Sequence, residues 1–116
     1  MSWLATVTEE RHGELPIAVI NGEIDASNAS EIADRLRRLL TNRSTALVVD
    51  LTGTSYLDSA GINLLFDLGT ELHSRQQELH LVVPATSPIA RAITFTGLDA
   101  AVPVHGSREA AVAHAG

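Results

Sequence analysis

The hydroxyl of Ser59 is the group in this sequence whose neighbours suggest a reactive site. Asp58 stands directly before Ser59, and Gly61 stands two residues after it. A hydrolase nucleophile of the elbow type needs glycine two residues before and two residues after the serine, because that sharp turn exposes the hydroxyl. Leu57 occupies the earlier position, so half of the pattern is missing. No histidine can be placed beside Ser59 from the sequence. We therefore predict that the chain is not an enzyme.

The sequence shows no pattern that is typical of a metal or cofactor site. It has no cysteine, and no two histidines stand four residues apart. The glycines do not form the phosphate loop G-x-x-x-x-G-K-S/T, and there is no lysine. We predict no metal and no cofactor, and we interpret most of the five histidines as solvated surface residues. They are His12, His73, His80, His105 and His114.

The charge of the 116-residue chain argues against nucleic acid as a partner. The net charge is −6, and the basic residues, which are all arginine, form no basic patch that could bind phosphates. No apolar stretch approaches the ~20 residues that cross a bilayer, and the N-terminus lacks the pattern of a signal peptide. The sequence therefore predicts one domain over residues 1–116, located in the cytoplasm and not bound to a membrane.

Hydrophobic patterning predicts the elements that must position Ser59. Alternating or continuous apolar runs predict strands over residues 3–8, 15–20, 46–51, 79–83 and 102–104. Apolar stripes with capping residues predict helices over 28–41, 59–75, 88–96 and 108–114. Asn28 with Glu31 fits a capping box, and Asp58 and Ser107 are N-cap candidates. Residues 52–57 are predicted to be a loop.

The predicted order is β-β-α-β-α-β-α-β-α, an opening hairpin followed by alternating helices and strands. This order is typical of an α/β domain with a central mixed β-sheet. In such sheets, functional sites form at the carboxyl ends of the strands. The segment from Asp50 to Ser59 follows a strand of continuous apolar residues and lies at such an end.

Four motifs in this order resemble the STAS domain of anti-sigma factor antagonists. They are Asn21–Asp25, Leu47–Leu51, Tyr56–Ile62 and Phe95–Asp99. The match spans almost the whole chain, and the combination of motifs is more specific than any one of them. The resemblance implies the STAS fold, with a central mixed sheet and about four helices packed mainly on one side.

The resemblance also implies a switch in which an unphosphorylated antagonist binds an anti-sigma factor that is itself a serine kinase. Binding releases the sigma factor. The kinase then phosphorylates the serine after the motif aspartate, here Ser59, and the antagonist dissociates. A metal-dependent serine phosphatase resets it. Several family members carry a second hydroxyl where this chain has Ala60, which leaves Ser59 as the acceptor. We expect a monomer or a weak dimer.

Ser59 is expected to be the first residue of its helix, with its hydroxyl exposed and Asp25, Asp58 and Gly61 around it. A phosphate would add about −1.5 to −2 charge there. The helix N-terminus favours that charge, whereas the two aspartates repel it. We expect Asp25 to orient Ser59 or to contact the kinase, and the alternative that it only forms a turn stays open.

The partner surface is expected to continue from Ser59 along one side of its helix, over Ala60, Asn63, Leu64 and Asp67. Leu64 and Leu68 could instead pack under a neighbouring element, an alternative that we favour for Leu68 but not for Leu64. A second functional reading also stays open. In that reading the chain is a constitutive STAS scaffold subunit of a larger regulatory or transport complex, indifferent to a charge at Ser59.

Overall fold

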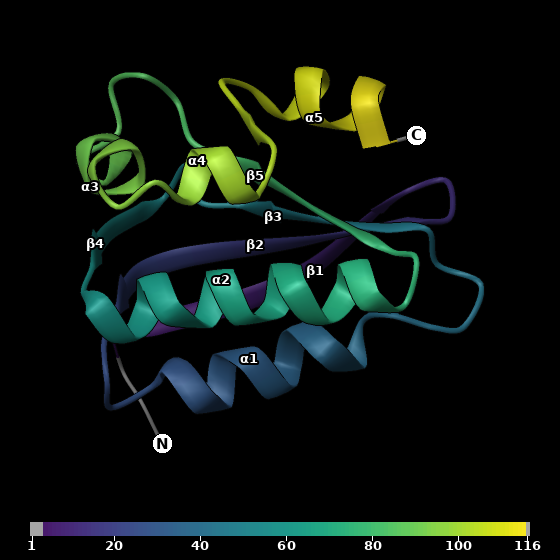
Figure 1. Cartoon of the computed structure of the whole chain (residues 1–116), viewed down its shortest axis with the longest axis horizontal. Helices are drawn as coiled ribbons and strands as arrows, with labels where there is room; N and C mark the ends of the chain where they lie inside the picture. Colours follow the sequence, from purple (N-terminus) through teal and green to yellow (C-terminus); the bar gives the residue numbers. More distant parts are fainter. Residues whose placement is uncertain (1–3, 116) are drawn as a thin grey trace.

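A mixed sheet of six strands runs through the computed structural model, which describes residues 4–115 (Figure 1). The main path of the sheet is β1-β2-β3-β5-β6, and β4 pairs with the far end of β2. β1 and β2 form the predicted antiparallel hairpin, and the remaining pairs are parallel. The strands are β1 (Ala5–His12), β2 (Leu15–Ile24), β3 (Ala46–Asp50), β4 (Thr54–Leu57), β5 (Glu78–Val82) and β6 (Val104–His105).

Helices cover both faces of this sheet, but unequally. Four of them share the large hydrophobic core with one face of the sheet, and α5 packs on the opposite face. Side chains alternate along β3, so that Leu47 and Val49 enter the large core while Val48 faces α5. The predicted packing, mainly on one side, is confirmed. The helices of the described chain are α1 (Ala29–Arg38), α2 (Ser59–Ser74), α3 (Ala90–Phe95), α4 (Leu98–Ala101) and α5 (Arg108–Ala115).

The α5 side of the sheet carries a much smaller apolar cluster. Ala111 of α5 is fully buried there against three sheet residues, which are Ile17, Val48 and Val82. The helix is also held by Arg108, whose guanidinium lies 3.0 Å from the Asp50 carboxylate and pairs with Glu10 of β1. Ser107 caps the helix as predicted, since its hydroxyl accepts the N–H of Ala110 at 3.1 Å.

Two predicted elements differ from the structure. Residues 54–57, predicted as a loop, form β4 because they pair with the end of β2, where Ile24 lies opposite Leu57. The predicted helix over 88–96 begins at Ala90 and is followed by the separate short helix α4. Gly97 divides them with a φ of +80°, a left-handed conformation that ends a helix readily.

The predicted capping box at α1 is wrong. Asn28 does precede the helix, but its side chain makes no capping hydrogen bond. Its Oδ1 instead accepts the Asp25 N–H at 2.9 Å, and its Nδ2 donates to the Glu23 carbonyl at 2.8 Å. Asn28 therefore shapes the turn that leads into the helix, and α1 ends at Arg38, before the predicted residue 41.

Smaller differences concern the ends of strands. The first predicted strand began at Trp3, which lies outside the described residues, and β1 continues to His12. β2 runs on to Ile24, and the edge strand β6 is shifted to Val104–His105. Among residues 4–115, no helix has the length and apolar character required to cross a membrane.

Candidate phosphorylation site and partner surface

Ser59 is exposed and is the first residue of α2, as predicted. Asp58 before it is the N-cap, and its Oδ1 accepts the Gly61 N–H at 3.1 Å. A side-chain oxygen in this position satisfies one of the N–H groups that a helix leaves unpaired in its first turn. The cap therefore fixes the start of α2 and keeps the Ser59 hydroxyl at the surface.

The loops that follow β2 and β4 are joined to each other at this point. The second oxygen of Asp58, Oδ2, accepts the Ala26 N–H at 3.3 Å. The backbone N–H of Asp58 donates to the Ile24 carbonyl at 3.2 Å. In Figure 1 the start of α2 and the segment leading into α1 lie at the same end of the molecule. The expectation that the Asp25 loop lies beside the Ser59 loop is confirmed.

Asp25 shapes its own loop. Its Oδ1 accepts the Ser27 N–H at 2.8 Å and also the Ser27 hydroxyl. These hydrogen bonds, the hydroxyl first, lower the pKa of Asp25 below its usual value, so that the carboxylate is charged throughout the neutral range. Asp25 therefore forms a turn, which is one of the two roles that the sequence allows for it. Any action of Asp25 on Ser59 or on a kinase remains a prediction.

Gly61 allows the first turn of α2 to approach the sheet closely. A Cβ atom at this position would lie 2.4 Å from Leu57 Cδ1 and 3.1 Å from Ile24 Cγ2. Gly61 is buried, and both neighbouring side chains belong to the large core. A larger residue would therefore push the N-terminus of α2, and Ser59 with it, away from the ends of β2 and β4.

A groove between α1 and α2 continues from the Ser59 turn. Its volume is about 420 Å³, and small side chains, Ala26, Ala29, Ala33 and Ala60, form much of its wall. All four predicted partner residues line it, because Asn63, Leu64 and Asp67 complete the α2 side. The α1 side was missed in the sequence, although Ala29 and Ala33 are spaced four residues apart, as on one face of a helix.

Leu64 occupies a different place from the one expected. Its side chain is only 8% exposed and belongs to the large core, so the exposed position predicted for it is wrong. α1 lies against α2, and Leu64 lines the groove between the two helices rather than standing on the surface. Leu68 is fully buried, as the favoured alternative proposed. Asn63 and Asp67 are exposed.

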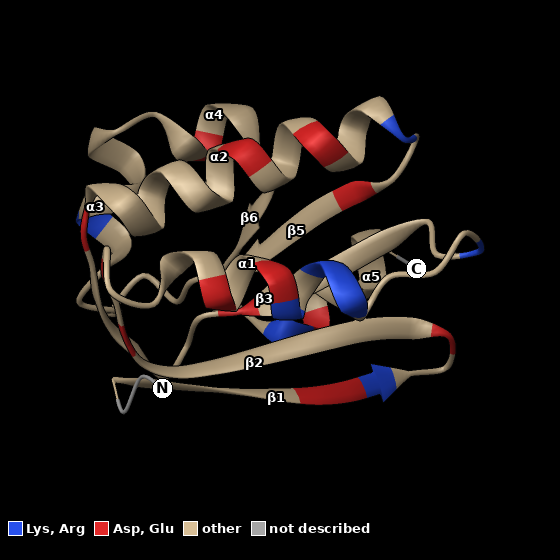
Figure 2. Cartoon of the chain, turned by 90° about the horizontal axis from the view of Figure 1, so that it is seen from below, with Lys and Arg blue, Asp and Glu red and all other residues tan. Residues whose placement is uncertain are grey.

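Charged residues border this groove. Arg37 of α1 is 3.1 Å from Glu71 of α2 and 3.2 Å from Asp34 of its own helix. Figure 2 shows acidic segments along α2, with a basic residue only beyond its far end. Acidic Asp34 and Asp67, from the two helices, line the groove together with Arg37. A partner entering the groove would meet small apolar side chains between mainly acidic borders.

Replacing Asp58 with alanine is expected to destabilise the fold by about 1 kcal/mol, since the α2 cap and the bond to Ala26 are both lost. Urea unfolding measures this change. Asp67→Ala is the matched control, because Asp67 is exposed in the same helix away from its N-terminus, and it should change the unfolding free energy by less than about 0.5 kcal/mol. Equal stability of the two variants would contradict the capping role.

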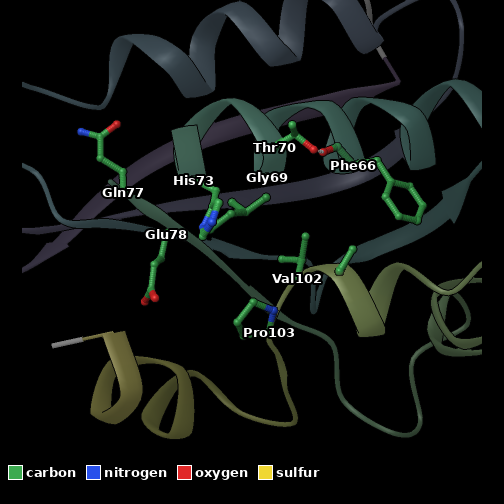
Figure 3. A pocket seen from close by; sticks show the side chains of 10 residues that line it. Phe66, Gly69, Thr70, His73, Gln77, Glu78, Val102 and Pro103 are labelled. Atoms are coloured by element: carbon green, nitrogen blue, oxygen red, sulfur yellow. Dashed lines mark hydrogen bonds between the residues drawn. The ribbon is translucent and has the colours of Figure 1, made fainter. Parts of the chain in front are cut away.

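A separate cavity of about 300 Å³ lies at the other half of α2, lined by residues of α2, β5 and the α4–β6 connection (Figure 3). Thr70, His73 and Glu78 supply its polar side chains, whereas the Gln77 amide points away from it. That amide donates instead to the carbonyls of Thr41 and Ser44. Neither Asp58 nor Ser59 lines this cavity, so it does not serve the Ser59 site.

The histidines follow the sequence interpretation in part. His12, His73 and His114 are exposed, but His80 on β5 is only 4% exposed and contacts His105. The burial of His80 was not visible in the sequence because it depends on the α5 layer above β5. Within residues 4–115, no group of three or more metal-binding side chains has the arrangement of a metal site.

Comparison with known proteins identifies close similarities. Residues 6–111 match the family model of the STAS domain. The anti-sigma-F factor antagonist RsfB of Mycobacterium tuberculosis is 32% identical over 94 residues, which cover 81% of this chain and 75% of that protein. A crystal structure of an anti-sigma factor antagonist from Mycobacterium paratuberculosis superposes with a TM-score of 0.80 at 26% identity. That alignment covers 96% of this chain and 93% of the other.

The fold is also shared with the Bacillus cell fate determinant SpoIIAA, solved in its phosphorylated form. The TM-score is 0.65 at 20% identity, with 94% of this chain and 98% of that one covered. At this identity the likeness concerns the fold. It shows that SpoIIAA has the same arrangement of sheet and helices as this chain.

Proposed function

The chain belongs to the STAS domain family, and on that premise we propose that it is an anti-sigma factor antagonist switched by phosphorylation of Ser59. In the unphosphorylated state it binds an anti-sigma factor that has serine kinase activity, and a sigma factor is released. Phosphorylated on Ser59, it no longer binds. A metal-dependent serine phosphatase returns it to the binding state. The protein acts in the cytoplasm and catalyses no reaction itself.

The observation that carries the proposal is the exposed Ser59 hydroxyl at a firmly capped helix start. A kinase needs access to the hydroxyl, and the exposed first position of α2 provides it. The helix N-terminus also tolerates a phosphate, because its free N–H groups and dipole favour negative charge. Phosphorylation can therefore change the surface without unfolding the domain.

The α1–α2 groove is the proposed binding surface for the anti-sigma factor. It begins next to Ser59, since Ala26 and Ala60 flank the site and also line the groove. Asn63 and Asp67 offer exposed polar groups along it, and Leu64 offers part of an apolar wall. A partner that fills this groove would contact the Ser59 turn, so a phosphate there would lie inside the interface.

Charge alone is strong enough to end such binding. Two unit charges about 4 Å apart repel by about 4 kcal/mol at an effective dielectric of 20. A loss of about 2.8 kcal/mol weakens a complex about 100-fold. Asp58 and the ionised Asp25 already make this end of the molecule negative. An acidic group on the partner, or a loss of close contact, would then suffice without a change of fold.

The protein is incubated with ATP and with each anti-sigma kinase of the same genome in turn. The kinase that is its partner is expected to add one phosphoryl group, on Ser59. Intact mass and peptide mapping measure this. Ser59→Ala should abolish the modification. Ser55→Ala, which removes an exposed hydroxyl four residues away on β4, should leave it unchanged. In a folded sample, modification of Ser59→Ala or no modification by any kinase contradicts the proposal and favours the scaffold reading.

A further inference from the structure

Three histidines from three elements stack beside α5. His80 of β5 and His105 of β6 have ring centroids 5.2 Å apart with an angle of 18° between the rings. His105 and His114 of α5 have centroids 5.0 Å apart at 32°. His80 is buried, His105 is half-buried and His114 is exposed, so the stack runs from the sheet outward to the helix. It connects β5, β6 and α5.

Hydrogen bonds fix how many protons this stack can hold. His80 Nε2 lies 3.1 Å from the Glu78 carboxylate, which can only accept, so His80 donates there. His80 Nδ1 lies 3.0 Å from His105 Nε2. When His80 is neutral its Nδ1 is unprotonated, so His105 donates to it from Nε2. His114 Nδ1 donates to the Ala110 carbonyl of its own helix at 2.8 Å.

The pair tolerates one added proton but not two. A singly charged His80 donates to Glu78 and to the neutral His105, so that both N–H groups of His80 have an acceptor. A second proton places two N–H donors and two positive charges against each other across 3.0 Å. The pKa of His105 is accordingly lowered. The largest cause is its partial burial, and the nearby His80 and His114 are the next two.

The contacts that hold α5 are otherwise few. Its buried apolar cluster is small, and Arg108 adds ion pairs with Asp50 and Glu10. Charged or titratable groups surround the stack and the helix on five elements. They are Glu10 on β1, Asp50 on β3, Glu78 and His80 on β5, His105 on β6, and Arg108, Glu109 and His114 on α5 itself. The carboxylates of Glu10 and Asp50 pair with Arg108, and the carboxylate of Glu78 lies beside His80.

We propose that the stack of His80, His105 and His114 is a pH-sensitive latch, which holds β6 and α5 on the sheet at neutral pH and releases them in mild acid. Release would uncover the apolar face formed by Ile17, Val48 and Val82. The device does not depend on Ser59, which lies in the layer on the opposite face of the sheet.

The direction of the pH dependence follows from the lowered pKa of His105. A histidine whose pKa is lower in the folded state binds its proton better when the contact is open. The latch is therefore complete above the ordinary value of 6.5, and it weakens as the pH falls from there to the lowered pKa. For one linked proton the equilibrium of opening changes by up to about tenfold per pH unit.

Hydrogen–deuterium exchange tests the latch. The protection of α5 and β6 is compared with that of α1 between about pH 7.5 and about pH 5, after correction for the intrinsic exchange rate. Relative protection of α5 should be constant above about pH 7 and should then fall by up to about tenfold per pH unit. Constant relative protection over the whole range would overturn the proposal.

Variants separate the latch from general destabilisation. His105→Gln cannot be protonated and is expected to remove the pH slope of α5, even if it lowers protection at neutral pH. His114→Gln removes one cause of the lowered pKa of His105 and so narrows the interval between that pKa and 6.5. The fall in protection should therefore begin at the same pH but be smaller in total. His73→Gln, exposed on α2, is the control and should keep the native slope. A fall in protection as large as the native one in both His105→Gln and His114→Gln overturns the latch.

Discussion

Replacing Ser59 with aspartate is expected to weaken binding to the anti-sigma factor about 100-fold or more. The new carboxylate stands at the exposed first position of α2, beside Asp58 and next to the α1–α2 groove. It brings charge and volume into the proposed interface, and about 2.8 kcal/mol of lost binding free energy gives a factor of about 100. Titration calorimetry or surface plasmon resonance with the purified kinase measures the dissociation constant.

Ser59→Ala and Ser74→Asp are the controls for this experiment. Ser59→Ala removes the hydroxyl without adding charge and should bind within a few-fold of the native protein. Ser74→Asp adds the same charge to the same helix, but its position is about 22 Å from the site at 1.5 Å per helical residue. It should also bind normally. Native affinity in Ser59→Asp would contradict the switch and support a constitutive scaffold.

Replacing Gly22 with alanine is expected to destabilise the fold by about 3 kcal/mol. Gly22 has a φ of +117°, and a Cβ atom there would stand 2.0 Å from the Leu4 carbonyl oxygen. That oxygen cannot simply move, because it accepts the Glu23 N–H at 2.8 Å. Urea unfolding with constant slope measures the loss.

Gly106→Ala is the matched control for Gly22→Ala. Apart from its chain neighbours, no residue has an atom within 4 Å of a Cβ at Gly106, and its φ is not in the left-handed region. The unfolding free energy of Gly106→Ala should therefore change by less than about 0.5 kcal/mol. The two variants differ mainly in where the methyl group is placed. If Gly22→Ala were as stable as Gly106→Ala, the tight approach of β1 to the end of β2 would not be required.

Local patterns were sufficient to predict the elements around Ser59. Asp58 at a helix start and an apolar stripe from Ile62 to Leu72 are signals carried by neighbouring residues, and α2 begins where they indicate. The apolar run Ala46–Leu51 likewise predicted a strand buried on both faces. The STAS resemblance supplied the helix layer, which is a property of the whole fold.

What the sequence did not reveal depends on contacts between distant residues. β4 exists because residues 54–57 pair with β2, some thirty residues earlier. Leu64 is buried because α1 lies against α2, and His80 because α5 covers β5. Asn28 had the residue type of a helix cap, but bonds to the Asp25 and Glu23 backbone compete for its side chain. Each of these features needs the tertiary structure.

The ion pair of Arg108 with Glu10 also bears on how the chain folds during synthesis. It joins residues 98 positions apart, and the same arginine reaches back 58 positions to Asp50. Because chains emerge from the ribosome N-terminus first, the sheet face with Ile17 and Val48 lacks the cover of α5 until residues 108–115 have been made. Until α5 docks, a nascent chain exposes this apolar strip, and we expect chaperones to recognise it at that stage.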